Sequence, residues 1–406
     1  MPPSLNPFRT LVRHRNFRLF WLGQTLSLIG TWMQAMAQGW LALELTNNAF
    51  YVGLVATVTS LPILLFSLHA GALVDRQEKL RLVKAGQVLF CVQAAVLWWV
   101  TWTGRVTIGW LLALATVNGL INAFEIPARQ SLVIELVGRE DLPGAIALNS
   151  SGFNLARVVG PSIGALIIAQ FGMAWCFGVN AISYVAVLVG LYLIRLPAWI
   201  PPTQTVSPSE AIREGIRYMR STRSISGLMW LVAVYSVLGV PYLTLMPVVA
   251  KQQLGLGAAG YGALLSCVGI GGLAGALGLA AVGDRVRRGA VLAGSSLSYA
   301  VLLIAFAFIR MPILAYPFLL FIGCAMIVNG AVANATLQHL VPNELRGRMM
   351  AAYSFVVVGL SQVLGSFAAG TVAGVVGAPW AIGGAAAIML VFAYAALVRR
   401  PELRTL

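Results

Sequence analysis

The chain has 406 residues, of which 59% are hydrophobic and 10% are charged, and its formal net charge is +15 at pH 7. Soluble domains carry about 25% charged residues, so this composition, with a mean hydropathy of +0.86, excludes a soluble fold and predicts a membrane protein. The four cysteines fall inside apolar runs without a CxxC spacing, and the three histidines form no metal-binding or triad pattern. We therefore expect no disulfide framework, no metal site and no cofactor.

Twelve apolar runs are long enough to cross a hydrocarbon core of ~30 Å, which takes about 20 helical residues. They lie near 17–43, 50–74, 82–103, 107–126, 144–170 and 173–195, and then near 226–250, 258–282, 289–309, 312–337, 347–373 and 378–398. The runs are continuous, which excludes the alternating strands of a porin, and the first run is too long for a cleavable signal peptide. The sequence predicts an all-α membrane protein with twelve transmembrane helices in two six-helix repeats.

The polar stretch between the sixth and seventh runs divides the chain. We expect an N-terminal six-helix bundle over 1–195, a cytoplasmic linker over 196–224 and a C-terminal six-helix bundle over 225–406. Within the linker, Ser209–Arg220 has apolar residues at 212, 216 and 219 and charges elsewhere. This pattern predicts an amphipathic helix on the cytoplasmic surface, and a plain connecting segment is the alternative.

Two short motifs recur about half a chain apart. Gly71–Arg76 ends in Asp-Arg, as does the segment 280–285, and Leu155–Gly160 aligns with Leu360–Gly365 at nearly the same offset. Two hydrophobic halves related by duplication are typical of secondary transporters.

The basic residues predict how the chain lies in the membrane. If the N-terminus is cytoplasmic, all 27 Lys and Arg residues fall in inner segments except Arg105, Arg157, Lys251 and Arg310. The positive-inside rule then places both termini in the cytoplasm. The net charge is explained by this topology and by contact with anionic membrane lipid, so nucleic acid is not an expected partner. We expect a multi-pass protein of a bacterial cytoplasmic (inner) membrane.

Two of the ionisable residues within the spans are candidates for a functional role, because charge inside a membrane is costly and faces a cavity or a partner. Glu125 shares a helical face with Asn118 and Asn122, and Arg157 lies about half-way through its span. The sequence favours Glu125 as a proton-coupling acid, with Arg157 biasing its pKa or holding an anionic group of the substrate. The alternative is that Glu125 pairs with Arg129 four residues later as an interfacial anchor.

Amide side chains in the spans are candidates for a central polar cavity. They lie in both halves of the chain, and Gln362 is the neutral counterpart of Arg157 in the second repeat. The alternative is that the amides hydrogen-bond helices to one another. The predicted cavity residues are Gln34, Gln38, Asn118, Asn122, Asn154, Asn329, Asn334 and Gln362.

The repeated Asp-Arg motif carries a family resemblance. Gly71-Ala-Leu-Val-Asp75-Arg76-Gln-Glu-Lys79 resembles the GxxxDRxxRR loop of the major facilitator superfamily, with Lys79 in place of the first closing Arg. The second half repeats it with Asp284, Arg285 and Arg288. A carboxylate at such a place can contact helix N-termini and guanidinium groups, and we expect these residues to form a cytoplasmic gate that opens and closes during alternating access. The alternative is that they only fix the loop topology.

Further motifs are similar to one branch of that superfamily. Gly160-Pro161-Ser-Ile-Gly164 resembles the GPxxGG motif of its antiporters. The segments 126–132, 141–150, 154–161 and 341–348 are similar to the enterobactin-exporter and macrolide-exporter branch. One departure is that the fourth run has no RxxQG motif, which argues against proton transfer by that route. The resemblance implies a monomer that exports a drug, macrolide or siderophore by antiport with protons.

The sequence as a whole predicts a secondary active transporter for an amphipathic small molecule. Many apolar residues and few charges favour bulky, partly apolar cargo over sugars or phosphates. An importer or uniporter of the same fold, or a transporter of lysophospholipid or lipid-linked substrates, remains an alternative. A non-transporting sensor or a membrane-embedded enzyme is a remote alternative, because the sequence shows neither an output domain nor a nucleophile–base arrangement. We therefore expect no enzymatic activity.

Overall fold

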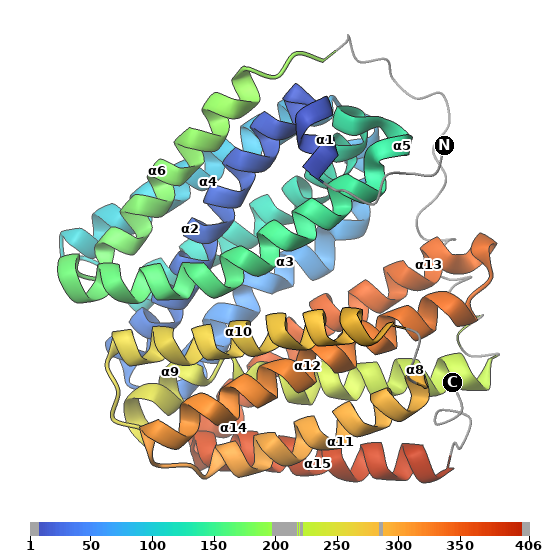
Figure 1. Cartoon of the computed structure of the whole chain (residues 1–406). Helices are drawn as coiled ribbons and strands as arrows, with labels where there is room; N and C mark the ends of the chain where they lie inside the picture. Colours follow the sequence, from blue (N-terminus) through green and yellow to red (C-terminus); the bar gives the residue numbers. More distant parts are fainter. Residues whose placement is uncertain (1–7, 197–216, 218, 220–221, 284–286, 400–406) are drawn as a thin grey trace. The chain divides into compact units, whose positions relative to one another are not determined.

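The computed structural model describes residues 8–196, 217, 219, 222–283 and 287–399, and it assigns these residues to helices and short connections. Figure 1 labels the α-helices. In the first half they are α1 (Phe8–Arg13), α2 (Arg15–Thr46), α3 (Ala49–Asp75), α4 (Lys79–Trp102), α5 (Ile108–Phe171) and α6 (Ala174–Tyr192). The expected amphipathic segment Ser209–Arg220 lies outside the described residues apart from Arg217 and Met219.

The second half is also helical, with several irregular turns. It consists of α8 (Arg223–Val234), the π-helical η1 (Tyr235–Gly239), the 3₁₀ turn η2 (Val240–Tyr242), α9 (Met246–Val248), the π-helical η3 (Val249–Gln253), α10 (Ala258–Val282), α11 (Arg288–Ala307), α12 (Pro312–Leu340), α13 (Asn343–Ser354), the π-helical η5 (Phe355–Gly365), α14 (Ser366–Val376) and α15 (Ala378–Arg399). Segments such as η1 and η5 continue the path of the neighbouring α-helices.

Ten helical segments among the described residues are long and apolar enough to cross a membrane. The difference from twelve arises in the first half. The expected spans 107–126 and 144–170 both lie in α5, whose 64 residues are about three times as long as a bilayer core requires. The expected first span falls in α2, which is helical but is not among the ten. The all-helical membrane fold is confirmed, and the twelve spans and the cytoplasmic termini stay predictions.

A single residue interrupts α5. Gly138 has φ 72° and ψ 175°, a backbone conformation that glycine adopts without steric cost because it has no Cβ. Pro127 and Pro143 also lie within α5. A Pro in a membrane helix is tolerated where neighbouring groups satisfy the freed carbonyl. The change of direction at Gly138 therefore separates two limbs of α5, one containing Glu125 and one containing Gly160.

The chain forms two compact units. One comprises Met1–Leu41 and Leu61–Val206, and the other comprises Ala42–Ser60 and Ser207–Leu406. The segment 42–60 thus groups with the second unit although it precedes much of the first in sequence. The expected bundle boundaries at 195 and 225 stay predictions.

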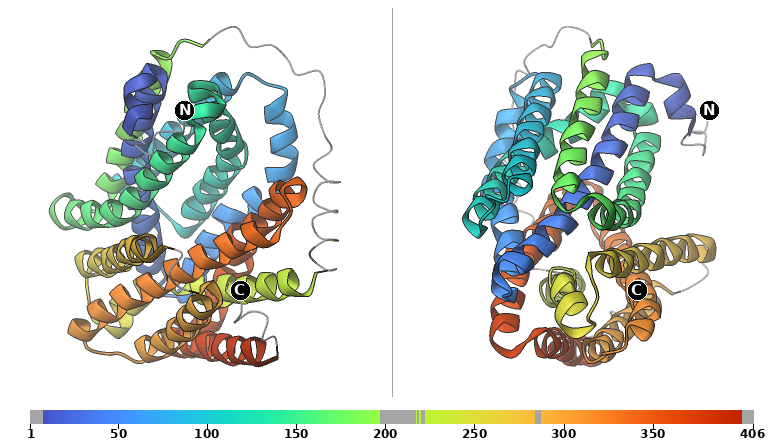
Figure 2. Two further views of the ribbon diagram at one scale, coloured as in Figure 1. Left: turned by 45° about the vertical axis from the view of Figure 1, so that its right-hand side comes forward. Right: turned by 90° about the vertical axis from the view of Figure 1, so that its left-hand side faces the viewer.

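The first unit is held by close packing of α2, α4, α5 and α6. The helices α4 and α6 run side by side (Figure 1 and Figure 2). Phe90 of α4 stacks on Tyr184 of α6 with 5.4 Å between ring centroids. A larger apolar cluster joins Phe17 and Phe20 of α2 to Leu132 and Leu148 of α5. These contacts fix the helices that present the polar residues described below.

The second unit combines paired helices with polar contacts. The helices α10 and α12 pack together, as do α11 and α15. The Tyr235 hydroxyl donates to the Ser296 carbonyl at 2.6 Å, which connects η1 to α11. Gly53 of α3 faces Gly370 of α14, where a Cβ on Gly53 would lie 2.7 Å from the Gly370 Cα. The two backbones approach this closely because neither residue has a side chain.

Candidate functional site

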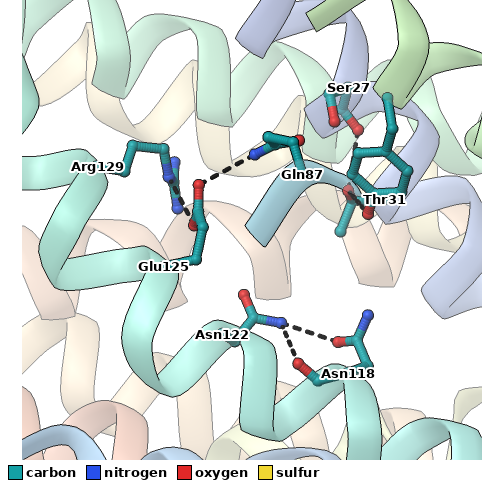
Figure 3. A network of polar contacts seen from close by, with 8 residues as sticks. Ser27, Thr31, Gln87, Asn118, Asn122, Glu125 and Arg129 are labelled. Atoms are coloured by element: carbon teal, nitrogen blue, oxygen red, sulfur yellow. Dashed lines mark hydrogen bonds and ion pairs between the residues drawn. The ribbon is translucent and has the colours of Figure 1, made fainter. Parts of the chain in front are cut away.

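Glu125 is a buried carboxylate on the first limb of α5. Only 3% of its surface is exposed, and among the acidic side chains that the structure describes it is the only buried one. Asn118 and Asn122 are half-buried on the same face, as their spacing of four and three residues from one another and from Glu125 predicts. Asn122 Nδ2 donates to Asn118 Oδ1 at 2.9 Å (Figure 3). The helix therefore presents a polar stripe two turns long that ends at the carboxylate.

Each carboxylate oxygen of Glu125 accepts one hydrogen bond. Arg129 Nε donates to Oε2 at 3.1 Å and forms an ion pair within α5. Gln87 Nε2 donates to Oε1 at 3.1 Å from α4, and Gln87 is itself only 2% exposed. Figure 3 shows the carboxylate between these two donors. A buried charge requires such partners, because desolvation is otherwise uncompensated.

A glycine makes room for this arrangement. A Cβ on Gly86 of α4 would lie 3.0 Å from Glu125 Cγ and 3.3 Å from Glu125 Cβ. Any larger residue at position 86 would press on the Glu125 side chain. Gly86 and Gln87 were not among the predicted site residues. Gln87 carries the signal that singled out Gln34, a lone amide within an apolar run, and was open to the same reasoning.

The structure does not place Arg157 on Glu125. The hydrogen-bond and ion-pair partners of Glu125 among the described residues are Gln87 and Arg129. Arg157 is half-buried on the second limb of α5, and Asn154, one turn earlier, is exposed and donates to the Ser150 carbonyl at 2.9 Å. Gln362 is half-buried in η5 of the other unit.

The predicted cavity residue Gln34 belongs to a buried amide network in the first unit. Gln34 Nε2 of α2 donates to Gln93 Oε1 of α4 at 3.3 Å. Asn180 Nδ2 of α6 donates to Gln34 Oε1 at 2.8 Å, and Gln93 Nε2 donates to the Leu114 carbonyl of α5 at 3.2 Å. The three amide residues are at most 3% exposed. Four helices are therefore cross-linked by side chains that bear no charge.

The other predicted amides lie in less extended contacts. Gln38 is 8% exposed, and its Nε2 has no hydrogen-bond partner in the part of the chain that the structure describes. Asn329 Nδ2 of α12 donates to Ser296 Oγ of α11 at 2.7 Å. Asn334 Oδ1 accepts from Gln338 Nε2 at 2.6 Å within α12. Asn329 thus joins two helices of the second unit, and the bond between Asn334 and Gln338 lies within α12.

The predicted gate is described in part. Gly71 lies within α3, Asp75 is its last residue, and Arg76 is exposed in the turn that follows. Lys79 begins α4 and is buried. Arg288 begins α11, while Asp284 and Arg285 lie outside the described residues. The gate contacts therefore stay a prediction.

The predicted antiporter motif packs the second limb of α5 against α2. A Cβ on Gly160 would lie 2.7 Å from Trp32 Cβ and 2.8 Å from the Ile29 carbonyl oxygen. A Cβ on Gly164 would lie 2.9 Å from Met33 Cγ. Pro161 is buried between the two glycines. The motif is a surface of close backbone approach between two helices of the first unit.

The described residues contain no group of three or more His, Cys, Asp or Glu side chains that could hold a metal ion. Around Glu125, Asn118 and Gln34 the polar contacts of the described residues are one ion pair and hydrogen bonds from uncharged amides. Such an arrangement can bind or release a proton at one carboxylate, and it offers amide and hydroxyl groups to a polar solute.

Comparison with known proteins gives matches along almost the whole chain. The model of a family described as transmembrane secretion effector matches residues 4–405. The multidrug efflux pump Tap of Mycolicibacterium fortuitum is 28% identical over 335 residues, which cover 79% of this chain and 80% of that protein. The enterobactin exporter EntS of Shigella flexneri is 24% identical over 347 residues, which cover 84% of this chain and 80% of that protein. The staphyloferrin A transporter of Staphylococcus aureus is 27% identical over 259 residues, 63% of this chain and 64% of that protein, so this match spans slightly less than two thirds of its length.

A solved structure has the same architecture. A bacterial homologue of the human lysosomal transporter Spinster superposes with a TM-score of 0.74 at 13% sequence identity, covering 96% of this chain and 97% of that one. At this identity the likeness is one of fold. The superfamily expected from the Asp-Arg loops is confirmed, and the matched family and relatives are transporters. The protein is a multi-pass membrane transporter that belongs to the transmembrane secretion effector family of the major facilitator superfamily.

Proposed function

We propose that the protein exports a bulky, amphipathic small molecule from the cytoplasm and takes up protons in exchange, with Glu125 as the coupling acid. Two relatives are by name an enterobactin exporter and a multidrug efflux pump, which supports a drug or a siderophore as the cargo. The observation that carries the proposal is the burial of Glu125 against one cation and one amide.

The ion pair supplies two alternative states. When Glu125 is ionised, Oε2 holds Arg129. A proton on Oε2 would remove the charge that holds the guanidinium and leave Arg129, whose side chain is 25% exposed, to interact with water or with an anionic group. Gln87 can remain bonded in both states, because an amide can donate to a carboxylate and accept from a carboxylic acid. Proton binding at Glu125 thus changes the position of one cation without dismantling the helix contact.

Exchange follows if the cargo and the proton favour different states. A ligand shifts a conformational equilibrium only by its difference in affinity for the two states. In this proposal the cargo binds the form in which Glu125 has released its proton and is ionised. The form with protonated Glu125 carries no cargo and returns to the cytoplasm-facing state. Asn118 and Asn122 lie next to the carboxylate on the same face, where they can hydrogen-bond a polar part of the cargo.

The remaining candidates have accessory roles in this proposal. Arg157 binds an anionic group of the cargo, and Gln38 and Gln362 offer neutral hydrogen bonds. The Asp75 and Asp284 motifs hold the cytoplasmic side closed when the cavity faces outward. The Gly160 surface lets α2 and α5 move as one body during alternating access.

The test is proton movement in proteoliposomes of the purified protein under an imposed pH gradient, with a panel of lipophilic drugs and siderophores. We expect cargo-dependent proton flux in the wild type and none with Glu125→Gln, which mimics the neutral acid. Glu140→Gln, which neutralises an exposed carboxylate of the same helix, is the matched control and should retain the flux. Cargo movement without proton flux in the wild type would overturn antiport and leave a uniporter. Coupled flux that survives in Glu125→Gln would assign the coupling to another residue.

A further inference from the structure

A groove of about 660 Å³ lies between α4 and α6 of the first unit, apart from the Glu125 site. Its polar lining comes from Glu78, Arg81 and Lys84, and its apolar lining includes Val88 and Leu89. Tyr192, the last residue of α6, closes one side. The helices α4 and α6 are both candidate membrane spans, and the groove lies where α4 begins and α6 ends. It therefore sits at the end of two neighbouring spans, where hydrocarbon gives way to headgroups.

The lining is divided between charge and hydrocarbon along α4. Arg81 and Lys84 are three residues apart and lie on one side of the helix. Val88 and Leu89 follow one turn further into the span and are 42% and 53% exposed. Large apolar side chains exposed on a transmembrane helix contact acyl chains. The groove thus offers cations to a headgroup and an apolar wall to a chain attached to it.

An aromatic ring orients one of the cations. Lys84 Nζ lies 4.6 Å from the centroid of the Tyr192 ring, a distance at which the ring face attracts a cation. Tyr192 is 66% exposed. This contact holds the ammonium at the groove, where it remains accessible to a ligand.

We propose that this groove binds a phosphatidylglycerol-type lipid. Arg81 and Lys84 would hold the phosphodiester, Val88 and Leu89 would contact an acyl chain, and the Glu78 carboxylate would accept hydrogen bonds from the glycerol hydroxyls. Two cations and one carboxylate leave the groove with one net positive charge, which matches the single negative charge of phosphatidylglycerol. A zwitterionic lipid would leave that charge uncompensated. The inference concerns a membrane lipid as a bound partner and does not depend on the cargo or on the coupling ion.

The test is native mass spectrometry of the full-length protein, purified, stripped of lipid and titrated with phosphatidylglycerol. Phosphatidylethanolamine and phosphatidylcholine with the same acyl chains serve as comparison lipids. We expect phosphatidylglycerol to bind most tightly, and Arg81→Gln with Lys84→Gln to weaken it on the order of tenfold. Tyr192→Phe keeps the ring and should bind as the wild type does, whereas Tyr192→Leu should bind several-fold more weakly.

The matched control is Arg105→Gln with Arg310→Gln, which removes the same charge from exposed positions away from the groove. Wild-type affinity in Arg81→Gln/Lys84→Gln would overturn the proposal, as would an equal loss in the control pair. Equal binding of phosphatidylethanolamine would reject the headgroup assignment. Displacement of the lipid by glycerol 3-phosphate at equal concentration would show a phosphate site and not a lipid site. If the double variant does not fold, as judged by its thermal transition, the comparison of Tyr192→Phe with Tyr192→Leu decides alone.

Discussion

Arg129 and Glu125 illustrate how one buried charge depends on another. The guanidinium lies 3.1 Å from a carboxylate that is 3% exposed. Loss of one member of a buried pair is more damaging than loss of both, because the remaining charge stays desolvated without compensation. The pair is therefore suited to a double-mutant cycle, which separates its structural part from its functional part.

We predict that Arg129→Gln lowers the free energy of unfolding by about 1–3 kcal/mol, since it leaves the Glu125 charge with the Gln87 bond alone. The double variant Arg129→Gln/Glu125→Gln should regain most of that stability. Thermal unfolding of the purified proteins measures both effects. If the double variant is less stable than Arg129→Gln, then burial of the Glu125 charge is not what the arginine compensates.

Gly160 is a second residue at which a small change is expected to lower stability, because its position leaves no room for a Cβ atom. We predict that Gly160→Ala lowers the unfolding free energy by about 1–3 kcal/mol, because its Cβ would meet the Ile29 carbonyl oxygen at 2.8 Å and backbone yields little. Gly278→Ala in α10 is the control, since a Cβ at that position has no neighbour within 4 Å. Thermal unfolding of the two variants should differ clearly, and equal transition temperatures would contradict the tight α2–α5 contact.

The sequence predicts some contacts of the candidate site and not others. The pairing of Glu125 with Arg129 follows from helical spacing and was the alternative that the sequence left open. The contact with Gln87 depends on which faces of α4 and α5 meet, and that packing is not encoded in the spacing within either helix. Gly86 could not be predicted for the same reason. The sequence contains many glycines in apolar runs, and only the packing of α4 on α5 shows that this one contacts Glu125.

At the scale of elements, α1 is fastened to α5 by charge. Arg13 Nη1 lies 3.0 Å and His14 Nε2 2.7 Å from Asp141 Oδ2. The hydrogen bond with His14, and then the charge of Arg13, hold the pKa of Asp141 below its ordinary value. Because the carboxyl pKa is lowered in the folded protein, the contact stabilises the fold at any pH above the pKa of the unfolded carboxyl group, about 3.9. This stabilisation is lost as the pH falls through the lowered pKa of the folded state.

We predict that Asp141→Asn loosens α1 at neutral pH, whereas the wild-type contact is lost only when the pH falls below the ordinary carboxyl pKa of about 3.9. Hydrogen exchange of the backbone amides of Phe8–Arg13 measures the change, with faster exchange expected in the variant. Glu140→Gln removes a neighbouring charge that has no such contact with Arg13 or His14 among the described residues and should exchange as the wild type does. Equal exchange in Asp141→Asn and Glu140→Gln would show that α1 is held by its apolar contacts.

The elements themselves follow from local sequence to different degrees. Apolar length predicts where helices run, because a membrane span is recognised within its own residues. It did not predict that α5 continues through residues 127–143, which lie between two of the expected spans. The π-helical η1 and η5 were also missed. A π-turn is a rare local widening of an α-helix. Its position depends on the residues packed against the helix, which the local sequence does not show.

For the whole molecule, the duplication visible in the sequence predicts a fold that the family match confirms. The two halves of the sequence nevertheless do not coincide with the two compact units, because residues 42–60 group with the second. Gly53 and Gly370 are more than three hundred positions apart in the sequence, and their backbones approach closely. The local sequence pattern of neither helix predicts this contact. Repeated motifs therefore predict the superfamily, whereas the division of the helices between packed units depends on long-range contacts that the sequence does not show.

The uncharged network of Gln34, Gln93 and Asn180 has a consequence for how a transporter can respond to a proton gradient. Amides do not titrate in the physiological range, so the cross-links among α2, α4, α5 and α6 are the same in acid and at neutral pH. Glu125 lies in the same four-helix group, and none of these amide hydrogen bonds includes its carboxylate. In the export mechanism proposed above, a change in the protonation of Glu125 would therefore leave the hydrogen bonds that join the four helices unchanged.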